Sequence, residues 1–271
     1  MMTMGFKGTP GIEDPRMWSS DYDETQFRTI SEASPNGLGV NEAYEMGISE
    51  LFGIEPLKRY LDFGGHMNRT PAQIIVDSIP DMEPNEQTDA EKLLIGYKIT
   101  ALLDQVGAIL PDGTRWPRPT AGFIDHMREL EVAQEAGAAI QTSIISAGHA
   151  EFMLATYDLW DLPYPDILIT DDVLQQEGTS LAPEQRAKPA PFPMEVVKRK
   201  WLGESLEEID DTVVCRRIIY TGDDATRDGG LAKNSRVRFV QIVPTAEHPG
   251  AWPEVGRFLR LGSAAFQGAK S

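Results

Sequence analysis

The sequence predicts an α/β protein, namely a doubly wound parallel-sheet (Rossmann-like) core with an inserted all-helical cap domain. From residue 110 onward, short apolar runs alternate with segments of helical periodicity, which is typical of doubly wound parallel sheets. Residues 41–109 show only helical spacing of their apolar side chains. Because a short apolar step at Met17 and Trp18 precedes this helical block, the block is expected to interrupt the sheet-forming part of the chain.

The expected domain boundaries follow from these changes in pattern. Residues 1–16, which are rich in glycine and proline, are interpreted as a loosely held leader. The core is expected to comprise residues 17–40 and 110–271, and the cap residues 41–109. A proline-rich stretch over 111–119 marks the return from the cap to the core.

Nine alternating elements are expected after the proline-rich stretch. In chain order they are a helix over 120–137, a strand over 138–145, a helix over 150–159, a strand over 167–170, a helix over 193–202, a strand over 216–221, a helix over 225–232, a strand over 237–243 and a helix over 252–261.

The composition indicates a folded, acidic protein. Its 271 residues, 41% of them hydrophobic, are enough to bury a sizeable core. A net charge of -17 disfavours binding to a nucleic-acid backbone. The lone cysteine, Cys215, excludes an intramolecular disulfide and a zinc site built from cysteines. Chemistry is therefore expected to depend on carboxylates, hydroxyls and lysines.

The hydropathy pattern favours a cytoplasmic protein without a membrane partner. No apolar run approaches the roughly 18 residues of a membrane span. Residues 1–14 are too polar for the core of a signal peptide.

Four polar clusters stand where the chemistry of a parallel sheet is expected, outside the carboxyl ends of its strands. The first, Asp21–Thr25, reads Asp-x-Asp-x-Thr and follows the short apolar step. Ser146–His149 follows the second strand, and Lys188–Pro191 precedes a helix. The fourth, Gly222–Asp228, reads Gly-Asp-x-x-x-x-Asp after an apolar strand.

In content and order these clusters resemble the haloacid dehalogenase-like hydrolase superfamily, and the early helical insertion resembles its helical-cap type. The likeness covers nearly the whole chain after about Arg16. Two departures concern the first motif: Glu24 stands where glycine is common, and the strand before Asp21 is short and weakly apolar.

The resemblance implies a magnesium-dependent phosphohydrolase that cleaves a small phosphorylated metabolite through an aspartyl-phosphate. Asp21 would be the nucleophile, and Asp23 would act as general acid and then as general base. The residue types suit this chemistry, because a carboxylate nucleophile divides one difficult displacement into two easier ones. Two carboxylates so close in sequence also share their titration, which would let Asp23 hold a proton.

The resemblance also implies a Mg²⁺ cofactor. Its ligands would be Asp21, the backbone carbonyl of Asp23 and Asp223, with Asp228 as a further direct or water-mediated ligand. An alternative role for the Gly222–Asp228 turn is helix capping, and the two roles can coexist.

Phosphate binding is expected from Ser146 and Lys188, which would donate a hydrogen bond and neutralise charge. Arg69, in a glycine-rich loop of the cap, is a candidate for contact with the distal part of the substrate, although a helix-linking turn is the simpler interpretation. The pair Asp171–Asp172 matches no role of the superfamily and is interpreted as structural.

Three alternatives remain at the level of sequence. Ser34–Leu38 could be a decayed first motif, which would make the protein a non-catalytic member that binds a phosphorylated ligand or a protein. A phosphomutase would use the same aspartyl-phosphate. A dehalogenase is disfavoured, because cleavage of a carbon–halogen bond needs no second acidic residue at Asp23. The substrate's identity and the oligomeric state stay open, a homo-oligomer included.

Overall fold

The structure, a computed structural model, describes residues 15–65, 71–203, 210–243 and 251–261. The chain divides into two compact units. The first, called the sheet unit, comprises Met1–Arg28, Pro119–Ala150 and Asp161–Ser271; the second, called the helical unit, comprises Thr29–Arg118 and Glu151–Trp160.

The sheet unit is built on one five-stranded parallel sheet with the strand order β5-β4-β1-β6-β7. Its strands are β1 (Arg16–Ser20), β4 (Ile140–Ile145), β5 (Ile167–Ile169), β6 (Ile218–Gly222) and β7 (Arg238–Gln241). The central strand β1 pairs with β4 on one side and with β6 on the other. A separate two-stranded sheet pairs β2 (Phe27–Arg28) with β3 (Arg118–Pro119).

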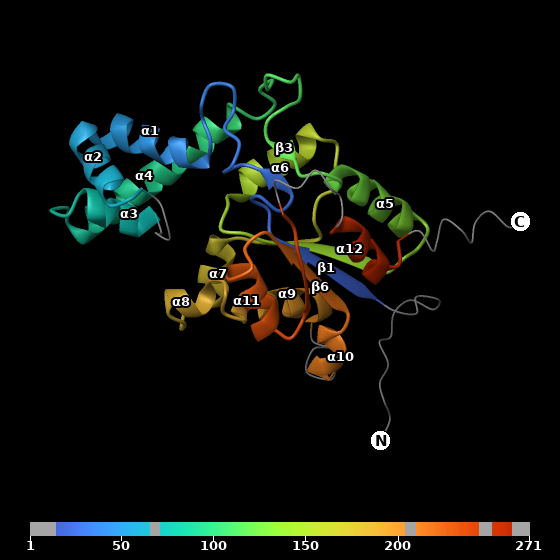
Figure 1. The fold of residues 1–271 in the computed structure, drawn as a ribbon. Helices are drawn as coiled ribbons and strands as arrows, with labels where there is room; N and C mark the ends of the chain where they lie inside the picture. The colour runs from blue at the N-terminus through green and yellow to red at the C-terminus, as the bar shows by residue number, and fades with distance from the viewer. Residues whose placement is uncertain (1–14, 66–70, 204–209, 244–250, 262–271) are drawn as a thin grey trace, which may run out of the picture. The chain divides into compact units, whose positions relative to one another are not determined.

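Helices cover both faces of the five-stranded sheet, as Figure 1 shows. On one face, α5 (Phe123–Glu135) and α12 (Trp252–Leu259) pack together and contact the indole ring of Trp18 from β1. On the other face, Met17 of β1 belongs to a buried apolar cluster with residues of α9 (Phe192–Leu202) and α11 (Arg227–Asn234). The short helices α7 (Asp171–Glu177) and α10 (Asp211–Cys215) contribute to the same cluster, and α8 (Pro183–Arg186) adjoins α7 and α9.

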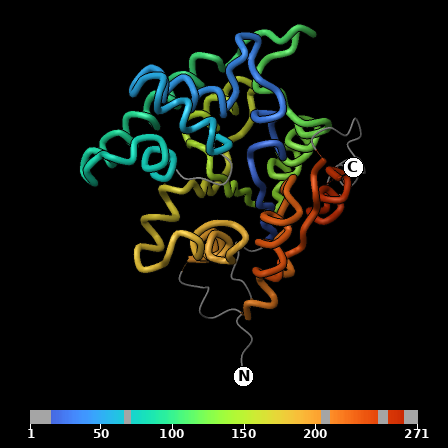
Figure 2. Tube along the Cα trace, turned by 60° about the vertical axis from the view of Figure 1, so that its left-hand side comes forward, coloured from blue at the N-terminus to red at the C-terminus, as the bar shows by residue number. Residues whose placement is uncertain are grey.

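Residues 41–109, which were expected to form a cap, fall within the larger helical unit. The helices of this unit are α1 (Val40–Phe52), α2 (Ile54–Asp62), α3 (Pro71–Ser78), α4 (Pro84–Leu103) and most of α6 (Ala150–Leu159). Figure 2 shows the first four as the blue to teal part of the trace. Helix α4 packs against α1 and α3, around a core that includes Tyr44, Ile48, Ile74 and Leu94. No helix among the described residues is long and apolar enough to cross a membrane.

The predicted fold class is confirmed, and the differences are local. The helix expected over 120–137 begins only at Phe123, because Gly122 adopts a left-handed conformation with φ of 82° and serves as its N-cap. The helix expected over 225–232 begins at Arg227 instead. Three short helices, α7, α8 and α10, were not predicted, since each is seven residues or fewer and shows too little periodicity.

One histidine makes the stability of the sheet unit depend on pH. The His126 side chain is 3% exposed, and its ring stacks on Trp252 and meets Trp18 edge-on, with centroid distances of 5.0 and 4.8 Å. Burial lowers the pKa of His126 from 6.5 to about 4. The folded protein therefore keeps this imidazole neutral over a pH range in which the unfolded chain protonates it.

We expect the free energy of unfolding to decrease as the pH falls from 6.5 to about 4, because the unfolded state then binds a proton that the folded state does not. The contribution of His126 is on the order of 3 kcal/mol when fully lost. Urea unfolding across this pH range should show a smaller decrease in the free energy of unfolding for His126→Phe than for the wild type. Carboxylates titrate equally in both proteins, so an equal decrease in the two proteins would contradict this role of His126.

Candidate active site

The polar residues predicted from sequence follow strands that end at the same edge of the sheet. In the sheet register, Ser20 at the end of β1 is level with Ile144 of β4 and Thr221 of β6. The residues just beyond these strands are Asp21, Ser146 and Asp223, respectively. The backbone N–H of Asp21 donates to the carbonyl of Thr221 at 2.8 Å and so continues the pairing to the motif itself.

The Asp-x-Asp-x-Thr segment forms a tight turn directly after β1. Oδ1 of Asp21 accepts a hydrogen bond from the backbone N–H of Tyr22 at 2.8 Å. The carbonyl of Asp23 accepts from the N–H of Thr25 at 2.7 Å. The Thr25 hydroxyl donates to Oδ1 of Asp223 at 3.2 Å and thereby ties the first motif to the fourth.

Lys188 lies at the centre of the site. Its Nζ is 2.6 Å from Oδ2 of Asp21 and 2.8 Å from Oδ1 of Asp228, and it lies 3.3 Å from both the Ile145 carbonyl and the Tyr220 hydroxyl. The side chain is only 8% exposed. Burial alone would lower the pKa of Lys188, but Asp21 and Asp228 raise it above its usual value. The ammonium is therefore held charged, in one position.

Asp228 is buried, and donors engage both of its carboxylate oxygens. Besides Lys188, the Tyr220 hydroxyl donates to Oδ1 at 3.0 Å, and the N–H of Asp224 donates to Oδ2 at 3.2 Å. Burial raises the pKa of Tyr220 well above its usual value, so its hydroxyl remains a donor. Sequence reasoning missed Tyr220, whose only signal is an aromatic hydroxyl on the same strand face as Gly222.

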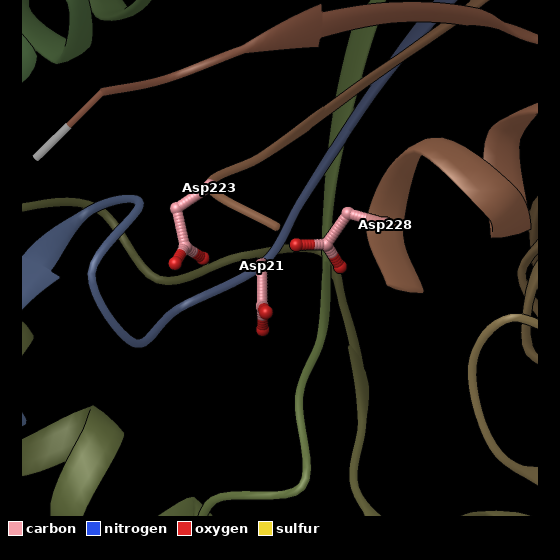
Figure 3. A group of neighbouring side chains, drawn as sticks. All are labelled: Asp21, Asp223 and Asp228. Carbon is pink, nitrogen blue, oxygen red and sulfur yellow. The ribbon is translucent and has the colours of Figure 1, made fainter. Parts of the chain in front are cut away.

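Three carboxylates converge at this point, as Figure 3 shows. One oxygen from each of Asp21, Asp223 and Asp228 can be chosen so that all lie within 4.8 Å of one another. Burial raises the pKa of Asp21 to about 7, against the lowering effect of Lys188, and raises that of Asp223 to about 6. A divalent cation fits such a site, because it would supply positive charge to oxygens that resist ionisation.

The exposure and hydrogen bonding of these oxygens indicate which of them a cation would use. Asp21 and Asp223 each offer a partly exposed carboxylate. The carbonyl of Asp23, which already accepts from Thr25, has a second lone pair. Asp228 is 1% exposed and its oxygens already accept three hydrogen bonds, which favours an indirect contact.

Ser146 and Asp23 form the remaining pair of the site. The Ser146 hydroxyl, buried after β4, donates to Oδ2 of Asp23 at 3.4 Å and accepts from the N–H of Gly148 at 3.1 Å. The long distance to Asp23 makes this a weak bond that a ligand oxygen could replace.

Other candidates from the sequence lie elsewhere. Arg69 falls outside the described residues. The rival motif Ser34–Leu38 belongs to the helical unit, where the Ser34 hydroxyl donates to Gln105 at 2.9 Å, and it follows none of the strands of the parallel sheet. Asp224 accepts from the N–H groups of Thr226 and Arg227, so it caps α11 beside the cluster.

Comparisons with known proteins identify the fold. No family model and no curated protein matches the chain. CbbY from Rhodobacter sphaeroides, solved in complex with phosphate, is 15% identical with a TM-score of 0.53, over 91% of this chain and 100% of that one. A HAD-superfamily hydrolase of subfamily IA from Geobacter sulfurreducens is 15% identical over 90% of this chain and 96% of that one, with a TM-score of 0.46.

The chain therefore shares its fold with CbbY, and the resemblance predicted from the motifs is confirmed at the level of the fold.

Glycine at position 222 allows Asp228 to reach the cluster. A Cβ added to Gly222 would lie 2.3 Å from the Asp228 Cβ, closer than any real contact. A Cβ on Gly230 would similarly lie 2.7 Å from the Pro189 Cβ, next to Lys188. These two glycines let α11 approach both the strand end and the lysine segment.

We expect Gly222→Ala to displace Asp228 and to destabilise the fold by about 1–3 kcal/mol, the usual cost of overpacking. Gly256→Ala in α12 is the matched control, because its Cβ would make only ordinary contacts of 3.8 Å or more. Urea unfolding of both variants measures the difference. Equal stability of the two variants would show that Asp228 does not need this close approach.

Proposed function

We propose that the protein is a magnesium-dependent phosphohydrolase that cleaves a small phosphorylated metabolite through an aspartyl-phosphate intermediate. The observation that carries the proposal is the buried Lys188 ammonium, which contacts both Asp21 and Asp228 beside Asp223. A fixed cation next to a candidate nucleophile suits the transfer of a group that carries negative charge. The solved complex of CbbY with phosphate, a protein of the same fold, supports this choice of ligand.

Asp21 is the proposed nucleophile. One of its carboxylate oxygens attacks phosphorus and forms the aspartyl-phosphate while the bond to the leaving alcohol breaks. Lys188, 2.6 Å from Oδ2 of Asp21, stabilises the negative charge on the transferring group. Water then attacks the phosphorus, which releases phosphate and restores the Asp21 carboxylate.

Asp23 is the proposed general acid and base. It gives its proton to the departing alcohol oxygen in the first step and takes a proton from the attacking water in the second. Its partner Ser146, at 3.4 Å, is proposed to turn its hydroxyl toward a phosphoryl oxygen when substrate binds. Ser146 and Lys188 would thus hold the phosphoryl group between them.

The residues that would hold Mg²⁺ are Asp21, Asp223 and the backbone carbonyl of Asp23, with Asp228 acting through water. A bound divalent cation supplies charge neutralisation for the phosphoryl oxygens. The Tyr220 hydroxyl and Lys188 keep Asp228 in place at the edge of this set. Substrate selection is assigned to the cap, residues 41–109, with Arg69 as a candidate contact.

We expect Asp21→Asn to lower turnover by several orders of magnitude while the fold stays intact, because it removes the nucleophile. Asp172→Asn, which removes an exposed carboxylate from the first turn of α7, is the matched control and should keep the wild-type rate. Phosphate release is measured from an aryl phosphate and from a panel of phosphorylated metabolites, with Mg²⁺ and with EDTA.

The same assay separates the alternatives. A wild-type rate in Asp21→Asn would remove Asp21 from the nucleophile's role. Folded wild-type protein that turns over no substrate in Mg²⁺ would favour a non-catalytic member that binds a phosphorylated ligand or a protein. Transfer of the phosphoryl group to a second hydroxyl of the substrate, without release of phosphate, would identify a phosphomutase.

A further inference from the structure

The sheet unit has a second candidate binding site, separate from the carboxylate cluster. A cavity of about 480 Å³ opens among α9, the start of α10 and the turn after α11, helices labelled in Figure 1. None of the residues assigned to the candidate active site lines it. A cavity of this size accommodates a small molecule.

The lining of this cavity carries more positive than negative charge. Three lining residues are cationic, Lys198, Arg199 and Arg236, whereas two are acidic, Glu195 and Asp211. This balance departs from that of the whole chain, whose net charge is -17. A local excess of cations on an acidic protein favours the approach of an anion.

Lys198 offers a buried charge with an unused donor. Its side chain is 7% exposed, and its Nζ donates to Oδ1 of Asp211 at 2.7 Å and to Sγ of Cys215 at 3.1 Å. An ammonium has three N–H donors, so one has no partner among the residues that the structure describes. Burial lowers the pKa of Lys198, but its two neighbours raise it above the usual value, so the group stays charged.

Ser235 lines the same cavity with a buried hydroxyl. The residue is 6% exposed, and within the described part of the chain its Oγ has no hydrogen-bond partner. A buried polar atom without a partner is unfavourable and uncommon in folded proteins. The Oγ is shielded from the cavity, because less than 1 Å² of its surface is exposed.

Arg236 adds an exposed guanidinium that forms no ion pair with any residue in the described ranges. Its backbone has φ of 58°, a left-handed conformation that is uncommon for residues other than glycine. This conformation ends α11, because Arg236 follows the C-cap Ser235 and the N–H of Val237 donates to the Ala232 carbonyl at 3.0 Å. The planar guanidinium matches the two oxygens of a carboxylate or a phosphate.

We propose that this cavity binds a small organic anion through a carboxylate or phosphate group. The contacts are the guanidinium of Arg236 and the unused donor of Lys198. Arg199 contributes charge at the edge, where it also pairs with Glu177 at 3.3 Å. The carboxylates of Glu195 and Asp211, which also line the cavity, oppose polyanions, so the ligand carries one or two negative charges.

Binding is measured directly rather than through catalytic activity. Pro191 lines the cavity and Lys188, nearby in the chain, contacts Asp21 in the candidate active site, so changes at the cavity could also alter the rate. Inorganic phosphate and acetate are titrated separately into the full chain in EDTA, with chloride to hold the ionic strength constant. Backbone amide resonances of residues 234–236 and 198 report occupancy by NMR. We expect saturable shifts with at least one of the two ions.

Arg236→Gln should weaken this binding at least about tenfold, as expected for losing hydrogen bonds to a charged ligand. Arg238→Gln is the matched control, since this exposed arginine pairs with Glu254 and does not line the cavity. Saturation by phosphate alone or by acetate alone identifies which oxyanion the site takes. Absence of saturable shifts with both ions, or equal weakening by Arg238→Gln, would overturn the proposal.

Discussion

The candidate active site depends on one buried ammonium. Lys188 lies 2.6 Å from Asp21 and 2.8 Å from Asp228, so it holds together two carboxylates that would otherwise repel each other. Removing this lysine would typically cost about 3–5 kcal/mol, because the two buried carboxylates would be left uncompensated. The central strand, the lysine segment and α11 must therefore all be in position before the site exists.

The acidic groups of the candidate active site outnumber its cation. One lysine faces three carboxylates, and burial raises the pKa of Asp21 to about 7 and that of Asp223 to about 6. A fold selected only for stability has little reason to bury acidic groups so close together. A cation that binds there relieves the repulsion, so the cost of burying these carboxylates is linked to the affinity for the cation.

The sequence predicted the elements that short-range patterns encode, namely the alternating strands and helices and the four polar clusters. The strand before Asp21 looked weak because Ser19 and Ser20 are polar, yet both are fully buried. The Thr221 hydroxyl donates to that of Ser20 at 2.8 Å, and the Trp18 indole donates to Thr221 at 3.1 Å. The hydrogen bond that satisfies Ser20 across strands depends on sheet order, which periodicity does not reveal.

The functional residues that the sequence did not predict are those that only the fold brings together. Tyr220 looked like an ordinary core residue of an apolar strand, and only the approach of α11 gives its hydroxyl a carboxylate partner. The anion cavity joins Lys198 to Ser235 and Arg236, which are adjacent to each other but far from Lys198 in the chain, so the three residues form no local motif.

A crystal structure with Mg²⁺ and beryllium fluoride would show whether Asp21 is the nucleophile beside Lys188. We expect beryllium bonded to Asp21, with the metal on Asp223. Beryllium fluoride bound away from Asp21, or no metal at Asp223, would contradict this assignment.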